Sequence, residues 1–308
     1  MRRIERKDHF MIEVRDVVKT FEGFRALDGL SINVPKGSVY GLVGPNGAGK
    51  STIIRHLTGA YRPDSGEVLY EGKPIYENEQ IKARIACIPD DIFYFSQNST
   101  LDMMKFLKGM YPSFDTGRYS KLKGAFQLDE RTPMRRLSKG MQKQAAFWLS
   151  LCQRPDVMIL DEPVDGLDPV MRRQVWGLIM GDVMENGTTV LISSHNLREL
   201  EDVCDHVGII HKGRIMLERT LSELQDNIVK IQVVFPDEDT EVPDSFDILH
   251  KSRTGRIVTL IVRGRTEEIS AQTAAMNPLF FDLLPLTLEE IFIYELGGAD
   301  YAVKDIIF

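Results

Sequence analysis

The chain has 308 residues, of which 43% are hydrophobic and 27% are charged. This balance indicates a folded globular protein and excludes a disordered or fibrous chain. The formal net charge of -7 argues against nonspecific nucleic-acid binding, which depends on Lys and Arg side chains that neutralise phosphates. No nucleic acid is therefore expected among the partners.

No stretch reaches the roughly 20 consecutive apolar residues that a membrane-spanning helix needs. The basic opening segment, residues 1–10, lacks the apolar core of a secretory signal. It is interpreted as a solvated tail or an upstream start before Met11, with a contact to anionic lipid as the alternative. The chain is expected to stay in the cytoplasm, so that any membrane role runs through a partner. Cys87, Cys152 and Cys204 are widely spaced without a metal-ligand pattern, and they are predicted to be reduced thiols.

Segments of alternating apolar and polar residues between residues 11 and 44 are bounded by Gly and Pro, and this pattern predicts strands. A helical pattern follows at residues 51–58 and ends at Gly59. Residues 66–76 then predict a hairpin, because their central Glu71-Gly72 pair suits a tight turn.

The chain is predicted to be largely helical from about residue 91 to residue 140. Two short apolar runs follow, at residues 157–162 and 188–194, with a helical stretch between them. Such runs are typical of the central strands of a parallel sheet, which is buried on both faces. The alternation of strand, helix and strand therefore predicts an α/β fold.

Residues 196–207 are predicted to form a helix with one apolar face. The residues on this face are Leu197, Leu200, Val203 and Val207. A closing hairpin is predicted at residues 207–218, and the character of the chain changes near residue 224. The prediction is a main domain over residues 11–224 and a small α+β accessory domain over residues 225–308.

A phosphate-binding loop is predicted between the apolar run 39–43 and the helix at 51–58. The loop satisfies the pattern G-x-x-x-x-G-K-[ST] with Gly44, Pro45, Asn46, Gly47, Ala48, Gly49, Lys50 and Ser51. Its glycines let backbone N–H groups converge on one anion, and the helix N-terminus adds its dipole. Lys50 is expected to reach the outer phosphates, Ser51 to bind Mg²⁺, and Thr52 to complete the nucleotide site.

Two acidic residues end the apolar run at 157–162. Asp161 is placed to hold Mg²⁺ and Glu162 to polarise the attacking water as the general base. The phosphate loop alone leaves kinases, GTPases, helicases and transporters open. Together with these acids, it predicts a nucleoside triphosphatase that uses Mg²⁺.

The segment LSKGMQ, residues 137–142, opens a helix just upstream of the Asp161 strand and resembles the LSGGQ signature of ABC ATPases. The resemblance extends from about residue 11 to about residue 221. It implies a P-loop fold of the ABC type with a parallel core sheet, an antiparallel β subdomain and a helical subdomain at about 91–140. The small C-terminal domain is then an α+β appendage to this cassette.

The resemblance implies further nucleotide-site residues. Phe21 looks like the aromatic position that stacks on adenine, Asp168 ends a segment that resembles the D-loop, and His195 resembles the switch histidine that contacts the γ-phosphate. Ser138 and Gly140 of the signature would face phosphate. The expected catalytic residues are therefore Lys50, Glu162 and His195, and the expected ligand is ATP with Mg²⁺.

Two departures from the family pattern stand out. The signature has Lys139 where glycine is usual and Met141 where glutamine is usual. Asp90 stands where the family generally has the Q-loop glutamine, and it is interpreted either as an Mg²⁺ ligand or as a loop acid without a metal role. Together with the segments VDGLDP, residues 164–169, and LTLEEIF, residues 286–292, these features resemble the exporter-type branch with separate membrane subunits. The resemblance is in particular to the Ytr-type ATPases of Gram-positive bacteria.

In this family two cassettes meet head to tail, so that the signature of one completes the ATP site of the other. The resemblance therefore implies a transport-coupled ATPase that works as a homodimer or heterodimer and powers an integral membrane subunit from the cytoplasmic face. Two alternatives stay open: an ABC ATPase that acts on nucleic acid or the ribosome, and an ATP-gated regulatory subunit with little turnover.

Overall fold

The computed structural model describes residues 10–92, 95, 97–236 and 246–296. The basic extension predicted for residues 1–10 lies outside this part of the chain, except for Phe10, which begins the first strand. The described chain forms two compact units. The first contains the residues up to His195 together with His206–Glu218, and the second contains Asn196–Asp205 and the residues from Arg219 onward.

A six-stranded sheet forms the centre of the first unit, with the strand order β10-β9-β3-β8-β7-β6. Its strands are β3 (Val39–Val43), β6 (Ile85–Ile88), β7 (Val157–Asp161), β8 (Thr189–Ser194), β9 (His206–His211) and β10 (Arg214–Thr220). The five strands from β9 to β6 run parallel. Every residue of β3, β7 and β8 is buried, as expected for strands covered on both faces.

A four-stranded antiparallel sheet accompanies the central sheet, with the order β2-β1-β4-β5. Its strands are β1 (Phe10–Phe21), β2 (Phe24–Pro35), β4 (Ser65–Tyr70) and β5 (Lys73–Pro74). The predicted tight turn at Glu71-Gly72 is confirmed, since φ is 48° at Glu71 and 77° at Gly72. One apolar cluster joins Ile12 and Leu27 of this sheet to Tyr40 of β3 and Ile53 of the following helix.

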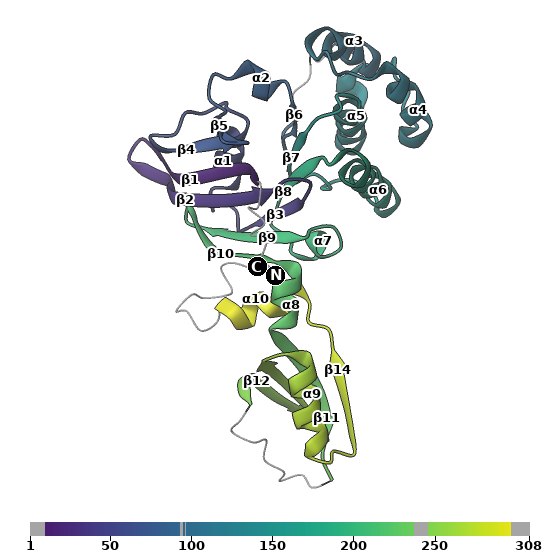
Figure 1. The fold of residues 1–308 in the computed structure, drawn as a ribbon. Coiled ribbons are helices and arrows are strands. Elements are labelled where there is room, and N and C mark those ends of the chain that lie inside the picture. Colours follow the sequence, from purple (N-terminus) through teal and green to yellow (C-terminus); the bar gives the residue numbers. More distant parts are fainter. Residues whose placement is uncertain (1–9, 93–94, 96, 237–245, 297–308) are drawn as a thin grey trace, which may run out of the picture. The chain divides into compact units, whose positions relative to one another are not determined.

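The helices of the first unit are α1 (Lys50–Leu57), α2 (Glu79–Lys82), α3 (Thr100–Met110), α4 (Thr116–Phe126), a short 3-10 turn (Met134–Arg136), α5 (Lys139–Cys152) and α6 (Pro169–Asn186). Helices α3, α4 and α5 lie together beside β6 and β7 (Figure 1). Trp148 of α5 stacks on Tyr119 of α4 with the ring centroids 4.3 Å apart. The predicted combination of a parallel sheet, an antiparallel sheet and a helical region is confirmed.

The second unit has its own antiparallel sheet, with the order β12-β13-β11-β14. Its elements are α7 (Arg198–Glu201), α8 (Leu221–Asp226), β11 (Ile228–Val234), β12 (Asp247–Thr254), β13 (Ile257–Arg263), α9 (Thr266–Ala275), β14 (Phe280–Leu284) and α10 (Leu288–Leu296). Ile231, Val233, Leu260 and Val262 fill a separate apolar core. This sheet and its helices form the α+β part of the chain.

Helix α7 belongs to the second unit, although it follows β8 directly in the sequence. Its Arg198 donates to Oε2 of Glu289 at 2.9 and 3.0 Å, and Oε1 of Glu201 accepts a hydrogen bond from the backbone N–H of Leu288 at 3.3 Å. The main domain expected from the sequence ran through this segment to residue 224.

The helix predicted over residues 196–207 is wrong in its extent, because α7 has only four residues. Val207 is not on the helix but in β9, where it pairs with Gly41 of β3. The apolar run that starts at Val207 is buried beside the central strand, and this tertiary pairing overrides the helical spacing.

Candidate nucleotide site

The predicted phosphate loop connects β3 to α1. Gly47 and Gly49 have φ values of 80° and 112°, in the left-handed region that favours glycine. A Cβ atom on Gly44 would lie 2.3 Å from the carbonyl oxygen of Ile210. The loop therefore requires its glycines for backbone conformation and for close packing, and Lys50 begins the helix directly after it.

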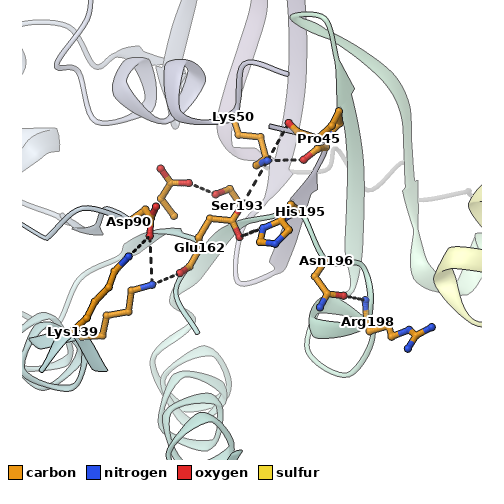
Figure 2. Close-up of polar contacts among 12 residues, drawn as sticks. Pro45, Lys50, Asp90, Lys139, Glu162, Ser193, His195, Asn196 and Arg198 are labelled. Carbon is orange, nitrogen blue, oxygen red and sulfur yellow. Dashed lines mark hydrogen bonds and ion pairs between the residues drawn. The ribbon is translucent and has the colours of Figure 1, made fainter. Parts of the chain in front are cut away.

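Lys50 folds back over this loop. Its Nζ atom donates to the carbonyl oxygens of Gly44 at 2.5 Å and Pro45 at 3.3 Å, and its side chain is only 7% exposed (Figure 2). The same atom lies 3.6 Å from Oε1 of Glu162. An ammonium group with three donors is thus held at the centre of the loop, where a triphosphate would meet it.

A cavity of about 290 Å³ opens beside the loop. It is lined by Phe24, Ala26, Pro45, Asn46, Gly47, Gly49, Lys50, Ser51, Thr52, Asp90, Asp161 and Glu162. The structure thus brings most of the predicted nucleotide residues together. Gly44 and Ala48 do not line the cavity: Gly44 packs against Ile210, and Ala48 is buried.

Three predicted metal ligands, Ser51, Asp90 and Asp161, line this same cavity. Asp161 ends β7 and is 6% exposed, and the hydroxyl of Ser193 donates to its Oδ1 atom. This bond fixes one carboxylate oxygen. A hydroxyl and a carboxylate offer the hard oxygen atoms that Mg²⁺ prefers, so the donor set fits that ion.

Glu162 links two predicted catalytic residues. Its Oε1 atom lies 3.6 Å from Nζ of Lys50, and its Oε2 atom lies 2.9 Å from Nδ1 of His195 (Figure 2). The Glu162 side chain is 11% exposed, whereas that of His195 is 49% exposed. A carboxylate in this position can accept a proton from water at the cavity, and His195 orients it from the outer side.

The signature and D-loop residues lie apart from this cavity. Ser138 precedes α5, and its Oγ atom accepts a hydrogen bond from the backbone N–H of Met141 at 3.3 Å. Asp168 precedes α6, and its Oδ1 atom accepts hydrogen bonds from the backbone N–H groups of Val170 and Met171, both at 3.0 Å. A Cβ on Gly140 would lie 2.5 Å from the carbonyl oxygen of Gly166. Ser138, Gly140 and Asp168 are absent from the described lining residues.

Two aromatic residues, Phe21 and Phe24, flank the turn between β1 and β2. Phe21, predicted to stack on adenine, packs its ring 5.7 Å from that of Tyr61 and has Lys19 above it at 5.6 Å. It is not one of the cavity-lining residues, whereas Phe24 is, with 67% of its surface exposed. Phe24 was not predicted from the sequence, although a second aromatic residue three positions after Phe21 was a visible signal.

Asp90 faces the start of the signature helix. Its Oδ1 atom lies 3.8 Å from Nζ of Lys139 and 3.6 Å from Nζ of Lys143. Lys143 also donates to the carbonyl oxygen of Glu162 at 2.5 Å. Burial lowers the pKa of Lys143, and the charge of Asp90 opposes that shift. Lys143 was also missed, and its signal was a lysine within the apolar helix that follows the signature.

Comparison with known proteins agrees with this architecture. The family model described as ABC transporter matches residues 27–165. The ABC transporter ATP-binding protein YtrB of Bacillus subtilis is 32% identical over 291 residues, which cover 94% of this chain and 99% of YtrB. The daunorubicin/doxorubicin resistance ATP-binding protein DrrA of Streptomyces peucetius is 36% identical over 225 residues, covering 70% of this chain and 67% of DrrA.

A similar fold is found in the solved structure of cbiO1 from Clostridium perfringens, described as part of the ABC transporter complex cbiONQ. It has a TM-score of 0.60 and 27% identity, and it covers 70% of this chain and 90% of that chain. The phosphate loop at the end of a parallel sheet, with an antiparallel sheet and a helical region beside it, defines an ATP-binding cassette.

The chain belongs to the ABC transporter ATP-binding proteins, and it functions as the ATP-binding subunit of such a transporter. The resemblance to Ytr-type ATPases is confirmed by the similarity to YtrB over nearly the whole chain. None of the helices in the described part of the chain combines the length and the apolar character that a bilayer crossing needs.

Proposed function

We propose that the chain hydrolyses ATP to ADP and phosphate, with Glu162 as general base. The observation that carries this proposal is the position of the Glu162 carboxylate, which lies between Lys50 and His195 at the edge of the cavity. Lys50 neutralises charge on the outer phosphates, Glu162 accepts the proton of the attacking water, and His195 keeps the Glu162 carboxylate oriented.

The nucleotide site extends along the loop. Pro45, Asn46, Gly47 and Gly49 provide backbone around the phosphates, and Ser51 and Thr52 lie at the helix start. We propose that Ser51 and Asp161 hold Mg²⁺, since both line the cavity and both offer oxygen atoms. When bound, this ion neutralises charge on the phosphate oxygens.

The active form proposed here is a head-to-tail dimer of two cassettes. The family resemblance assigns three further residues to the nucleotide site: Ser138, Gly140 and Asp168. None of the three is among the described residues that line the cavity of their own chain. Pairing with a second cassette, identical or different, would bring such residues to the partner's ATP. The monomer is then expected to hydrolyse ATP slowly.

The proposed transport partner is an integral membrane subunit that keeps the chain at the cytoplasmic face. A second cavity, of about 380 Å³, lies at the end of β6 and beside α3 and α5. Its apolar lining includes Ile88, Ile92, Met103, Leu107 and Tyr111. Met and aromatic residues are enriched where interfaces are anchored, so this groove is the proposed docking site.

Two exposed rings contact each other at the groove-lining helix α3: Phe106 is on the helix, and Phe95 precedes it in the sequence. Phe95 and Phe106 are 48% and 43% exposed, and their rings contact edge to face at 5.5 Å. Phe93 and Tyr94, which precede Phe95 in the sequence, lie outside the described residues. Phe95→Ala is expected to abolish stimulation of ATPase activity by the membrane subunit while the isolated cassette keeps its basal rate. Equal loss of basal turnover and thermal stability would instead assign Phe95 to the internal packing.

The central experiment is Glu162→Gln, which removes the base at nearly constant shape. We expect kcat to fall by about 10² to 10⁴ while ATP binding persists. Mg-ATP should then shift the protein to a dimer in sizing chromatography, and Glu185→Gln, an exposed change on α6, is the matched control. Near-normal turnover of Glu162→Gln would remove Glu162 from the role. A wild-type protein without steady-state turnover would support the ATP-gated regulatory alternative.

A further inference from the structure

A fully buried lysine lies one turn into the signature helix. Lys143 has no exposed surface, and its neighbours on α5 include the buried Ala145, Ala146 and Phe147. A lysine is almost never buried completely unless it is paired, because the ammonium group loses its hydration. The position of Lys143 therefore depends on what its Nζ atom contacts.

The Nζ atom of Lys143 joins two segments that lie outside its own helix. It donates to the backbone carbonyl oxygen of Glu162 at 2.5 Å and lies 3.6 Å from Oδ1 of Asp90. Oδ1 of Asp90 is itself buried, and no hydrogen bond to it is found among the described residues. The nearby ammonium groups of Lys143 and Lys139 offset the energetic cost of burying this carboxylate oxygen.

Glu162 needs support from outside its own segment. Its φ value of 45° places a non-glycine residue in the left-handed region, which is costly unless surrounding contacts maintain it. The backbone N–H of Glu162 donates to the carbonyl oxygen of Ser193 at 3.1 Å, and its own carbonyl oxygen accepts from Lys143. These two hydrogen bonds fix the backbone at Glu162 and therefore the direction in which its side chain points.

We propose that Lys143 is a positioning residue for Glu162, and that Asp90 acts as its counter-ion. This inference rests on the proposed role of Glu162 as general base. Lys143 maintains the backbone of Glu162 from the signature helix, and Asp90 compensates the buried charge from the loop after β6. The contact thereby connects the loop after β6, the start of α5 and the end of β7 through one ammonium group.

This arrangement also connects two departures from the family pattern. Asp90 replaces the usual glutamine and Lys139 replaces a usual glycine, and their charged groups lie 3.8 Å apart. An aspartate at position 90 is thus accompanied by two lysines, at positions 139 and 143, one helical turn apart on α5. The Asp90 carboxylate is paired with lysine side chains of the protein, and in this proposal it is not a ligand of the metal ion. We therefore expect Asp90→Asn to leave the Mg²⁺ titration of the ATPase unchanged.

The test separates the positioning of Glu162 from simple charge balance. Lys143→Met leaves the Asp90 carboxylate without its buried partner and removes the donor to Glu162. We expect a lower thermal midpoint and a loss of kcat of about 10- to 100-fold, with little change in the affinity for a fluorescent ATP analogue. Adding Asp90→Asn should restore thermal stability but not kcat, because the carbonyl oxygen of Glu162 still lacks its donor.

A second readout does not depend on turnover. In the absence of nucleotide, amide hydrogen exchange of the segment 157–168 should be faster in both Lys143→Met and the double variant than in the wild type. Arg118→Met is the matched control, since Arg118 and Asp182 form a partly buried ion pair with an N···O distance of 2.7 Å, and neither residue lines the cavity. It is expected to lower the thermal midpoint without changing kcat or exchange in that segment.

The outcomes distinguish the inference from the proposed function. If kcat of Lys143→Met stays at the wild-type level while Glu162→Gln is inactive, the positioning role is wrong and the general base stands. If the Asp90→Asn change restores kcat together with stability, Lys143 only balances charge. If Lys143→Met does not fold, Lys143→Gln with and without Asp90→Asn gives the same comparison. Near-normal turnover of Glu162→Gln would instead overturn the proposed function itself.

Discussion

Gly140, in the signature, lies directly against Gly166, in the loop that follows Glu162. A Cβ atom added to Gly140 would lie 2.5 Å from the carbonyl oxygen of Gly166, closer than nonbonded atoms approach. The contact is between backbone atoms, so neither side can relax by a change of rotamer. The signature helix and the D-loop are thus packed together within one chain.

The first prediction follows from this contact. Gly140→Ala should force the signature away from Gly166, with a destabilisation of about 1–3 kcal/mol from overpacking. We also expect lower ATPase activity, because in the proposed head-to-tail dimer a displaced signature would no longer meet the partner's nucleotide correctly. Chemical denaturation and steady-state ATPase rates on the purified protein provide the measurements.

Gly177 provides the control for this substitution. It lies within α6 with nothing within 4 Å of an added Cβ. Gly177→Ala should therefore be neutral or stabilise by about 0.5–1 kcal/mol through the higher helix propensity of alanine. If the Gly140→Ala and Gly177→Ala variants were equally stable, the backbone at Gly166 could move aside at little energetic cost, and the prediction would be wrong.

The second prediction concerns the adenine base. Family resemblance assigns stacking to Phe21, but Phe24 lines the cavity while Phe21 packs against Tyr61. Loss of a base–aromatic stack costs about 1–3 kcal/mol. We expect Phe24→Ala to weaken binding of a fluorescent ATP analogue more than Phe21→Ala does.

Competition by inorganic triphosphate serves as the control, because it contains no base. Its affinity should be unaffected by either substitution. A larger loss for Phe21→Ala would restore the assignment made from the family resemblance, and it would imply that the ring leaves Tyr61 when nucleotide binds.

The third prediction concerns the thiols. Burial raises the pKa of Cys87 to about 12 and that of Cys152 to about 12, and it raises the pKa of Cys204 as well. The thiolate is the reactive form, so all three cysteines should react slowly with an aromatic disulfide reagent at pH 8. Denaturant should make all three react rapidly.

The same shift has a consequence for stability. An unfolded thiol loses its proton near pH 8.5, whereas these folded thiols keep theirs to much higher pH. The stabilisation from the protonated thiols is present below that value and declines as the pH rises toward 12. A thiol that reacts rapidly in the native protein at pH 8 would contradict this account for its residue.

The fourth prediction concerns the second unit. Leu288 has no exposed surface, and its backbone N–H donates to Glu201 of α7. Leu288→Ala should destabilise this unit by about 2–5 kcal/mol through the cavity that it leaves. Amide exchange in residues 196–205 should rise at the same time, since this segment belongs to the same unit.

Leu279→Ala is the matched change in the same unit, because Leu279 is 62% exposed. Its effect on stability should be within about 0.5 kcal/mol of zero. Faster exchange in the β sheet of the second unit, without any change in residues 196–205, would show that α7 is held by other contacts.

Much of the fold and of the cavity could be predicted from the sequence because the relevant residues are close together in the chain. The phosphate loop from Gly44 to Ser51 follows β3 directly, and Asp161 and Glu162 stand at the end of β7, so local pattern and chemistry indicate the same site. Strand, helix and strand alternation likewise predicts the parallel sheet.

The features that were missed depend on contacts across the chain. Lys143 is notable only because its ammonium group meets Glu162, nineteen positions further along the sequence. Val207 has helical spacing with Leu200 and Val203, but pairing with β3 places it in a strand. A lysine within an apolar helix is visible in the sequence, but spacing along the chain does not show which distant segment Lys143 or Val207 contacts.

The division of the chain between its two units limits how the protein can be shortened. The second unit consists of Asn196–Asp205 and the residues from Arg219 onward. The segment between them, His206–Glu218, belongs to the first unit. A chain that stopped at Glu218 would keep α7 but lose Glu289 and Leu288, which bind it. The second unit therefore cannot be removed by truncating the C-terminal end alone, because the chain already enters this unit at Asn196, directly after His195.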